Sequence, residues 1–162
     1  MVMGSAVGSG QHQKQFLKWE GPLDSFTAAM PEDWPPYFQQ CIAESRDAME
    51  LFVITEKDCI VAGGMVFEGL PADMQVFDDD VRPYIEKGYL YIGYLFVDQA
   101  HRGKQLGSLW LTCIKGLYGS KGFWLTVEEP GLREFYEKNG FTWVKSLKKE
   151  GDSEELLLRE PD

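Results

Sequence analysis

Apolar residues follow two different spacings along this chain, and these spacings predict where its strands and helices lie. Runs or alternations of apolar residues predict strands at 15–20, 51–55, 59–69, 89–97, 122–127, 141–149 and 155–160. Apolar residues three or four positions apart predict helices at 31–48, 102–118 and 128–140, the first of them starting near Pro35 or Pro36. Residues 24–30 are expected to form one or two helical turns before Pro31. This order predicts a mixed α/β (α+β) fold with one central sheet.

Two stretches depart from these patterns. Gly63 and Gly64 lie inside the predicted strand at 59–69, where glycines indicate a β-bulge or the close approach of another element to the backbone. The stretch 70–88 has no clear period, and carboxylates outnumber cations in it: Asp73, Asp78, Asp79, Asp80 and Glu86 against Arg82 and Lys87. We expect a polar excursion, either a solvated loop or a surface that attracts a cationic ligand.

The most informative stretch runs from residue 95 to residue 119. The strand that leads into it, YLYIGYLFV at 89–97, is apolar or aromatic almost throughout, as is typical of a strand covered on both faces. The helix that follows has one apolar face, formed by Leu106, Leu109, Trp110, Cys113, Ile114 and Leu117. Between the strand and this face lies a short basic turn.

This turn is a candidate anion site. A helix N-terminus leaves backbone N–H groups unpaired and carries a partial positive charge. Arg102 and Lys104 add two cations, and Gly103 and Gly107 allow an anion to approach the backbone closely. The sequence therefore predicts a phosphate-bearing ligand. The alternative is an ordinary helix start with two solvated cations, which would leave the glycines and the preceding strand unexplained.

Composition favours one globular domain. The chain has 162 residues, of which 44% are hydrophobic, and this is enough for one sizeable core. We expect a loose tail at 1–14 and a single domain at 15–162. The net charge of −10 argues against a nucleic-acid or anionic membrane surface, which would repel the protein. No apolar run reaches the ~18 residues of a membrane span, and no signal peptide is recognised, so we expect a cytoplasmic protein.

The cysteines and histidines of the sequence give little support for metal or thiol chemistry. Cys41, Cys59 and Cys113 have no close-paired spacing, and we interpret them as buried or half-buried apolar residues in a reducing compartment. The chain contains only two histidines, His12 and His101, so a site with several histidines is excluded. No metal cofactor is predicted.

Two motifs resemble those of the GNAT superfamily, the acyl-CoA-dependent N-acetyltransferases. LFVDQAHRGKQLGSLWL at 95–111 is similar to the family's central strand and its R/Q-x-x-G-x-G/A pyrophosphate loop. FYEKNGF at 135–141 is similar to the family's short helix and the strand after it. The resemblance extends from about residue 15 to residue 160. It implies a mostly antiparallel sheet of about six to seven strands with a splayed central pair, flanked by about four helices.

The resemblance also implies acetyl-CoA as the co-substrate. Arg102 occupies the family's R/Q position and Gly107 its G/A position. The pyrophosphate would be held by Arg102 and by the backbone N–H groups of Gly103, Lys104, Gln105, Leu106, Gly107 and Ser108. The backbone of Leu95, Phe96 and Val97 would contact the pantetheine arm. Two residues depart from the family pattern: Gln105 stands where glycine is usual, and Glu129 where many members have asparagine.

For the chemistry, the resemblance assigns a general acid but does not fix the general base. Tyr136 matches the family tyrosine that protonates the coenzyme A sulfur, and the oxyanion would meet a backbone N–H near Phe96. The alternative for Tyr136 is a packing role in the core. The general base is not fixed by any motif, since the family positions on the central strand hold Tyr91 and Gly93 here. We take Glu68 as the best candidate.

Other candidates for the base are Glu128, Glu129 and a water chain that includes Tyr91. Together these residues predict transfer of an acetyl group from acetyl-CoA to a primary amine of a small molecule or peptide, by direct attack in a ternary complex. A non-catalytic GNAT-fold module that binds CoA or acyl-CoA as a sensor, or a partner-binding domain, is the alternative. We also expect that the last strand, 155–160, can pair across a homodimer.

Overall fold

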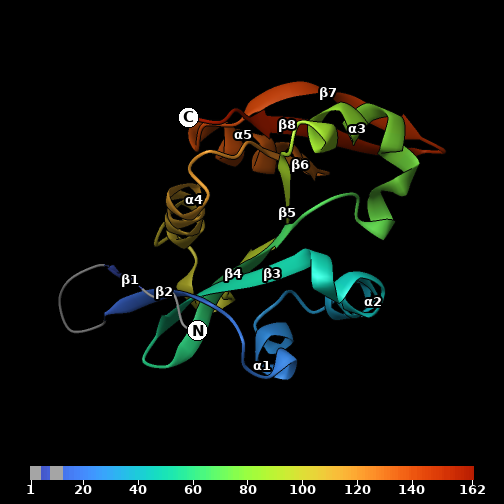
Figure 1. The fold of residues 1–162 in the computed structure, drawn as a ribbon. Coiled ribbons are helices and arrows are strands. Elements are labelled where there is room, and N and C mark those ends of the chain that lie inside the picture. Colours follow the sequence, from blue (N-terminus) through green and yellow to red (C-terminus); the bar gives the residue numbers. More distant parts are fainter. Residues whose placement is uncertain (1–4, 8–12) are drawn as a thin grey trace.

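The computed structural model describes residues 5–7 and 13–162, and their strands form one sheet. Its order is β1-β2-β3-β4-β5-β6-β8-β7 (Figure 1). The strands are β1 Ser5–Val7, β2 Lys14–Lys18, β3 Met49–Glu56, β4 Cys59–Phe67, β5 Leu90–Val97, β6 Phe123–Val127, β7 Thr142–Lys149 and β8 Asp152–Arg159. All neighbours are antiparallel except β5 and β6. The predicted single, mostly antiparallel sheet is confirmed.

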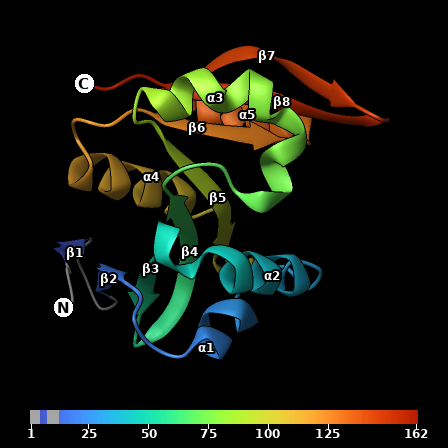
Figure 2. The ribbon, with the colours of Figure 1, turned by 45° about the vertical axis from the view of Figure 1, so that its right-hand side comes forward.

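Helices cover both faces of this sheet. They are α1 Leu23–Ala28, α2 Pro35–Ser45, α3 Asp78–Glu86, α4 Leu106–Leu117 and α5 Pro130–Lys138, with short 3-10 helices η1 Arg46–Ala48, η2 Ala72–Phe77 and η3 Gln99–His101. Figures 1 and 2 show α4 on the opposite side of the sheet from α1 and α2. The buried residues accordingly form two clusters, one with α1, α2, η2 and α3 and the other with α4 and α5.

Between β4 and β5 the prediction of an unpatterned excursion at 70–88 was wrong, because η2 and α3 fill it. Only Val81 of α3 is buried, and Pro83 lies inside the helix, so the sequence carries little helical signal. Aspartates in the first turn favour the helix through its dipole. The side chain of Arg82 adds support by pairing with Asp78 at 2.7 Å, one turn away.

The glycine pair in β4 has both of the predicted consequences. The pairing register shifts between Gly63 and Met65, so that Tyr94 and Leu95 of β5 together lie opposite Gly64. On one face, a Cβ atom at Gly64 would lie 2.6 Å from the ring of Trp110 in α4. The bulge and the close approach are therefore confirmed, and α4 packs directly on the backbone of β4.

Other expectations were partly corrected. Cys59 is exposed rather than buried or half-buried, because it follows the β3–β4 turn, whereas Cys41 is buried and Cys113 half-buried. The last strand cannot pair across a dimer, because β6 and β7 flank β8 on both sides. Of the predicted tail, residues 1–4 and 8–12 lie outside the described residues, while Ser5–Val7 pair with β2. The division at residues 14 and 15 stays a prediction.

Of the helices in the described part of the chain, none has the length and apolar character that crossing a bilayer requires.

Candidate functional site

The loop after β5 is shaped by two residues with left-handed backbone conformations. Gly103 has φ +81° and Gln105 has φ +59°. Backbone N–H groups converge on one side of such a turn and form a concavity suited to an anion. Because of these two residues, α4 begins at Leu106 and not at 102 as predicted. The candidate anion site is therefore a turn that precedes the helix together with the first helical turn.

The first turn of α4 leaves its backbone donors available. The earliest hydrogen bond inside the helix runs from the N–H of Leu109 to the carbonyl of Gln105, at 3.0 Å. The N–H groups of Leu106, Gly107 and Ser108 precede it, and no side chain caps this end of the helix. Three donors and the positive end of the helix dipole thus face the turn. This is the geometry that the sequence predicted for a phosphate.

The charged side chains beside these donors are exposed. Arg102 and Lys104 are both at the surface, and neither forms an ion pair with a described residue. Gly103 has open space around it, since an added Cβ atom would meet nothing within 4 Å. Two exposed cations and an uncrowded backbone leave room for an anionic ligand.

Gln105 adopts the conformation that glycine would adopt without strain. Left-handed backbone geometry costs an L-residue about 1–2 kcal/mol, and glycine loses part of that advantage through its larger conformational entropy. We therefore expect Gln105→Gly to raise the free energy of unfolding by about 0.5–1 kcal/mol in urea titrations. Gln105→Ala keeps the strain and should stay within about 0.5 kcal/mol of the original protein. Equal stabilities of the glycine and alanine variants would contradict this explanation.

The two central strands separate beside this loop. β5 and β6 pair only at Leu90 with Phe123 and at Tyr91 with Trp124, although β5 continues to Val97 (Figure 2). Beyond Tyr91, the edge of β5 that faces β6 has no strand partner. The splayed pair implied by the resemblance is confirmed. The predicted pantetheine contacts, Leu95, Phe96 and Val97, all lie in this unpaired part of β5.

A strained residue lies in the same part of β5. Tyr94 has φ +55°, which is unusual for a bulky side chain, and it belongs to the bulge opposite Gly64. Its ring contacts those of Trp34 and Phe38, with centroid distances of 5.9 and 5.3 Å. Burial and the nearby charge of Asp73 raise the pKa of Tyr94 above its ordinary value. Such strain persists where the surrounding structure holds it, and it is often found at functional sites.

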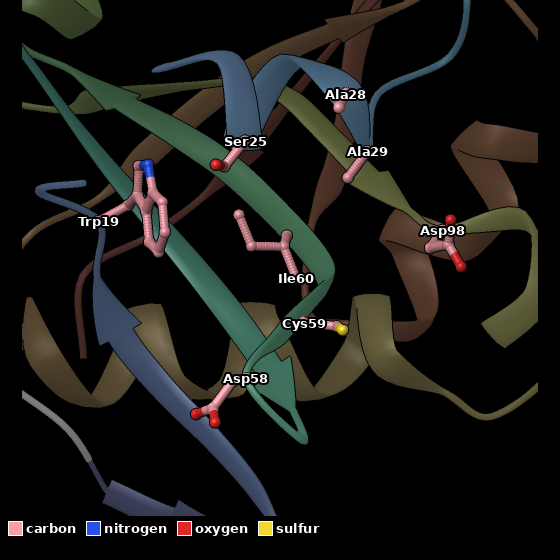
Figure 3. A pocket seen from close by; sticks show the side chains of 8 residues that line it. All are labelled: Trp19, Ser25, Ala28, Ala29, Asp58, Cys59, Ile60 and Asp98. Atoms are coloured by element: carbon pink, nitrogen blue, oxygen red, sulfur yellow. The ribbon is translucent and has the colours of Figure 1, made fainter. Parts of the chain in front are cut away.

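Cavities adjoin the end of β5 on the α1 side. One, of about 480 Å³, lies beside Arg102 and Val97 and is closed by the segment between α1 and α2. Another, of about 340 Å³, shares Ala28, Ala29 and Asp98 with the first. Figure 3 shows Trp19 and Asp98 at opposite ends of this second cavity. The two cavities therefore adjoin at these shared residues, and the larger one reaches Arg102 of the loop.

Tyr136 is buried in the α4–α5 cluster. Only 8% of it is exposed, and its ring packs against Phe135 and Phe141 at 5.0 and 5.5 Å between centroids. Burial raises the pKa of Tyr136 well above its ordinary value, so the phenol keeps its proton. The family role as an acid and the packing role both remain compatible with this position.

Helix α5, which carries Tyr136, is fixed to the start of α4 by two contacts. A Cβ atom at Gly107 would lie 2.9 Å from the ring of Phe135, so this glycine lets the two helices approach. In addition, the side-chain amide of Asn139 donates to the hydroxyl of Ser108 at 3.1 Å. The loop residues and Tyr136 therefore belong to one packed unit.

The carboxylates proposed as the general base have no such contacts that join them to the loop. Glu68 is exposed and follows the end of β4, where Phe67 pairs with Tyr91 near the start of β5, whereas the loop follows the other end of β5. Its side chain makes no hydrogen bond or ion pair with a described residue. Glu128 and Glu129 are also exposed. The structure gives none of them a distinguishing contact, and the assignment of Glu68 stays a prediction.

One carboxylate does stand out, although the sequence did not single it out. Asp73 in η2 is exposed as a residue, but its carboxyl group is partly buried, and this desolvation raises its pKa. Burial is the main cause of the raised pKa of Tyr91, Tyr94 and Cys41, and the charge of Asp73 adds to it. The signal that could have revealed η2 is the buried series Pro71, Met74 and Phe77, which has the period of three of a 3-10 helix.

The described side chains contain no cluster of three or more histidine, cysteine, aspartate or glutamate residues that could hold a metal ion.

Comparison with known proteins identifies a family to which this chain is similar. Residues 19–141 match the Acetyltransferase (GNAT) family. A search of curated protein sequences gave no match. Among solved structures, the fold is similar to that of a protein from Desulfovibrio desulfuricans described as an acetyltransferase of the GNAT family, with a TM-score of 0.68, 16% identity and coverage of 91% of this chain and 98% of that one.

Two further structures share the fold at low identity. FeeM, an N-acyl amino acid synthase from uncultured soil microbes, has a TM-score of 0.65 and 13% identity, and the match covers 93% of this chain and 92% of that one. A protein described as a streptothricin acetyltransferase from Bacillus anthracis, solved with acetyl coenzyme A, has a TM-score of 0.52 and 15% identity over 73% and 65% of the two chains. From the family match and the splayed sheet, this chain belongs to the GNAT acetyltransferase family.

Proposed function

We propose that this protein is an N-acetyltransferase that transfers an acetyl group from acetyl-CoA to a primary amine of a small molecule or peptide. The loop at 102–108 is the observation that carries the proposal. It combines uncapped backbone donors, two exposed cations and a glycine with open space, at the point where β5 and β6 have separated. These features suit the pyrophosphate and pantetheine parts of one extended ligand.

In this proposal, Arg102 and the N–H groups of residues 103–108 hold the pyrophosphate. The unpaired edge of β5 at Leu95, Phe96 and Val97 binds the pantetheine arm as an added strand would be bound. A backbone N–H of the same strand stabilises the oxyanion that forms on the thioester carbonyl. The amine nitrogen attacks the carbonyl carbon, a C–N bond forms, and the C–S bond breaks as the sulfur receives a proton. Tyr136, which burial keeps protonated, is the proposed donor.

The binding step has a direct test by thermal denaturation. Acetyl-CoA at ~100 times its dissociation constant should stabilise the fold by ~2.7 kcal/mol. S-acetyl-pantetheine at the same concentration lacks the pyrophosphate and should produce a much smaller rise in melting temperature. Equal effects of the two ligands would show that the loop does not hold the pyrophosphate. An unchanged melting temperature with both would overturn the assignment of a CoA site.

A non-catalytic acyl-CoA-binding module is the second candidate, and two observations favour it. Gln105 and Glu129 replace residues that are common in the family, and Glu68 has no contact that places it at the site. Release of free thiol from acetyl-CoA distinguishes the two functions. We would measure it with n-butylamine, spermidine, a tripeptide with a free N-terminus and a lysine peptide with a blocked N-terminus. Tight CoA binding without thiol release from any of these amines would favour the non-catalytic module.

A further inference from the structure

The gap between β5 and β6 has a closed end and an open end. Tyr91 and Trp124 are the last residues that pair across the two strands, and the candidate CoA loop lies at the other end, beyond Val97. The pantetheine arm of the proposed ligand would run along β5 from this loop. An extended arm is about 15 Å long, or about four to five strand residues at ~3.3 Å each, so its sulfur would reach Gly93 or Tyr94. The acyl group beyond the sulfur would then extend toward the closed end.

The ring of Tyr91 occupies this closed end, on the face of the sheet opposite α4. It packs on Trp124 of β6, with ring centroids 4.6 Å apart. It also lies over Gly93, because a Cβ atom there would be 2.6 Å from the Tyr91 ring. Only 7% of Tyr91 is exposed. The ring thus fills the space that a side chain at residue 93 would take, directly beside the expected position of the acyl group.

Other buried side chains surround the closed end. On the face of Tyr91, Met74 of η2 is buried, and its sulfur lies 3.6 Å from the hydroxyl of Thr126 in β6. On the α4 face, Ile92 of β5 and Leu125 of β6 are buried. Protein interiors are closely packed, and extra methylene groups enter them only by displacing side chains. A longer acyl chain could therefore enter this end only if the Tyr91 ring left its place.

We propose that the ring of Tyr91 determines the length of the acyl chain that this protein accepts, so that acetyl and propionyl groups fit and hexanoyl or longer groups do not. This inference rests on the proposed acetyltransferase function and adds the acyl specificity of that site. The reason is bulk, because the rigid ring is held between Trp124 and Gly93. The hydroxyl of Tyr91 takes no part in the exclusion, which distinguishes this role from one in proton transfer.

The acyl-chain profile of the original protein is the first test. With the best amine of the four named above, kcat/KM should decline from acetyl-CoA through propionyl-CoA to butyryl-CoA. Hexanoyl-CoA should be poorer than acetyl-CoA by about 100-fold or more, because a single methylene group that a pocket does not fit changes kcat/KM by about 10–200-fold. Equal kcat/KM for acetyl-CoA and hexanoyl-CoA would overturn the role of Tyr91 and leave the protein an acyltransferase.

Substitutions of Tyr91 should change this profile in proportion to the space that they create. In Tyr91→Ala, the ratio of kcat/KM for hexanoyl-CoA to that for acetyl-CoA should rise by about tenfold or more. Tyr91→Leu leaves a smaller cavity and should raise the corresponding ratio for butyryl-CoA, which keeps the test available if the alanine variant does not fold. Tyr91→Phe retains the ring and should retain the original profile. An unchanged profile in the alanine and leucine variants, or a changed one in Tyr91→Phe, would overturn the proposal.

Tyr89→Ala is the matched control for loss of a buried tyrosine. Tyr89 is also 7% exposed, but it precedes the paired positions of β5, and its hydroxyl donates to Glu160. Its substitution should lower the melting temperature much as Tyr91→Ala does, while the acyl-chain profile stays that of the original protein. The same gain with hexanoyl-CoA in both alanine variants would show a general loosening of the fold and would overturn the role of Tyr91.

Binding provides a readout that does not depend on turnover. In thermal denaturation, hexanoyl-CoA should stabilise the original protein no more than free CoA at the same concentration, because its chain stays outside the closed end. In Tyr91→Ala or Tyr91→Leu it should stabilise more than free CoA, because the chain is then buried. A larger effect of hexanoyl-CoA in the original protein would overturn the role of Tyr91. Binding of acetyl-CoA without transfer to any amine would overturn the acetyltransferase proposal alone, and this comparison would still decide whether Tyr91 limits the chain.

Discussion

Trp110→Ala is expected to lower the free energy of unfolding by about 3–5 kcal/mol, as large-to-small substitutions of buried tryptophan do. The side chain of Trp110 is fully buried, and its ring lies against the backbone of Gly64. Its indole N–H donates to the carbonyl of Phe52 in β3 at 3.0 Å. Because Gly64 has no side chain to fill the space, removal of the ring leaves a cavity between α4 and β4. Urea unfolding followed by circular dichroism measures the loss.

Trp110→Phe separates the two contributions. It retains an aromatic ring over Gly64 but removes the hydrogen bond to the carbonyl of Phe52, which should cost about 0.5–1.5 kcal/mol. Thr112→Ala is the matched control, because Thr112 lies in the same helix but is exposed, and it should change stability by less than about 0.5 kcal/mol. A loss below about 1 kcal/mol for Trp110→Ala would mean that α4 does not depend on this contact.

The same contact explains why part of the fold could be predicted from sequence. Gly63 and Gly64 interrupt an apolar strand, and a strand glycine needs a reason such as a bulge or a close neighbour. The apolar face of α4 contained Trp110, the neighbour in question. Both signals are local, since each depends on residues within a few positions of one another. For that reason the long apolar strands and α4 were found near their true positions.

The crossover between β4 and β5 could not be predicted in this way. Helix α3 buries little beyond Val81, contains Pro83, and is stabilised by charge pairs that have no hydrophobic period. Its position depends instead on Lys145, more than 60 residues away, which pairs with Asp80. Contacts of this kind come from tertiary packing, and propensity gives little information about them.

In the candidate site, too, one part could be predicted from local sequence and another part could not. The anion loop is one continuous segment, so its glycines, cations and helix start were visible together in the sequence. Even there, the left-handed conformation of Gln105 was not predicted, because a non-glycine residue seldom adopts it. Asp73 of η2 influences Tyr91 of β5 although the two are far apart in the sequence and no motif joins them. Glu68 was chosen as the candidate base because it lies at the end of the strand before β5, and that assignment stays a prediction.

Tyr136→Phe is expected to lower kcat by about 100-fold while the KM for acetyl-CoA stays within about twofold, because in the proposed mechanism it removes only the proton donor for the leaving thiolate. The ring contacts with Phe135 and Phe141 remain, so the free energy of unfolding should change by less than about 1 kcal/mol. Single-turnover measurement of thiol release reports the chemical step directly. A packing tyrosine would give the opposite pattern, with activity retained.

Tyr118→Phe is the matched control. Its hydroxyl donates to Glu50 at 2.7 Å, outside the candidate site, so its loss should cost about 1 kcal/mol of stability and leave turnover unchanged. The pH dependence adds a further distinction. Burial raises the pKa of Tyr136 well above its ordinary value, so the phenol is protonated throughout the neutral range. The loss in Tyr136→Phe should therefore be the same at pH 7 and at pH 9.

The identity of the leaving group gives the sharpest test of Tyr136. A selenoester analogue of acetyl-CoA releases a selenol, which is more acidic than a thiol and departs without needing a proton. If Tyr136 protonates the leaving group, Tyr136→Phe should lose much less activity with the selenoester than with the thioester. If the loss is equal for both donors, Tyr136 acts on a step other than departure of the sulfur.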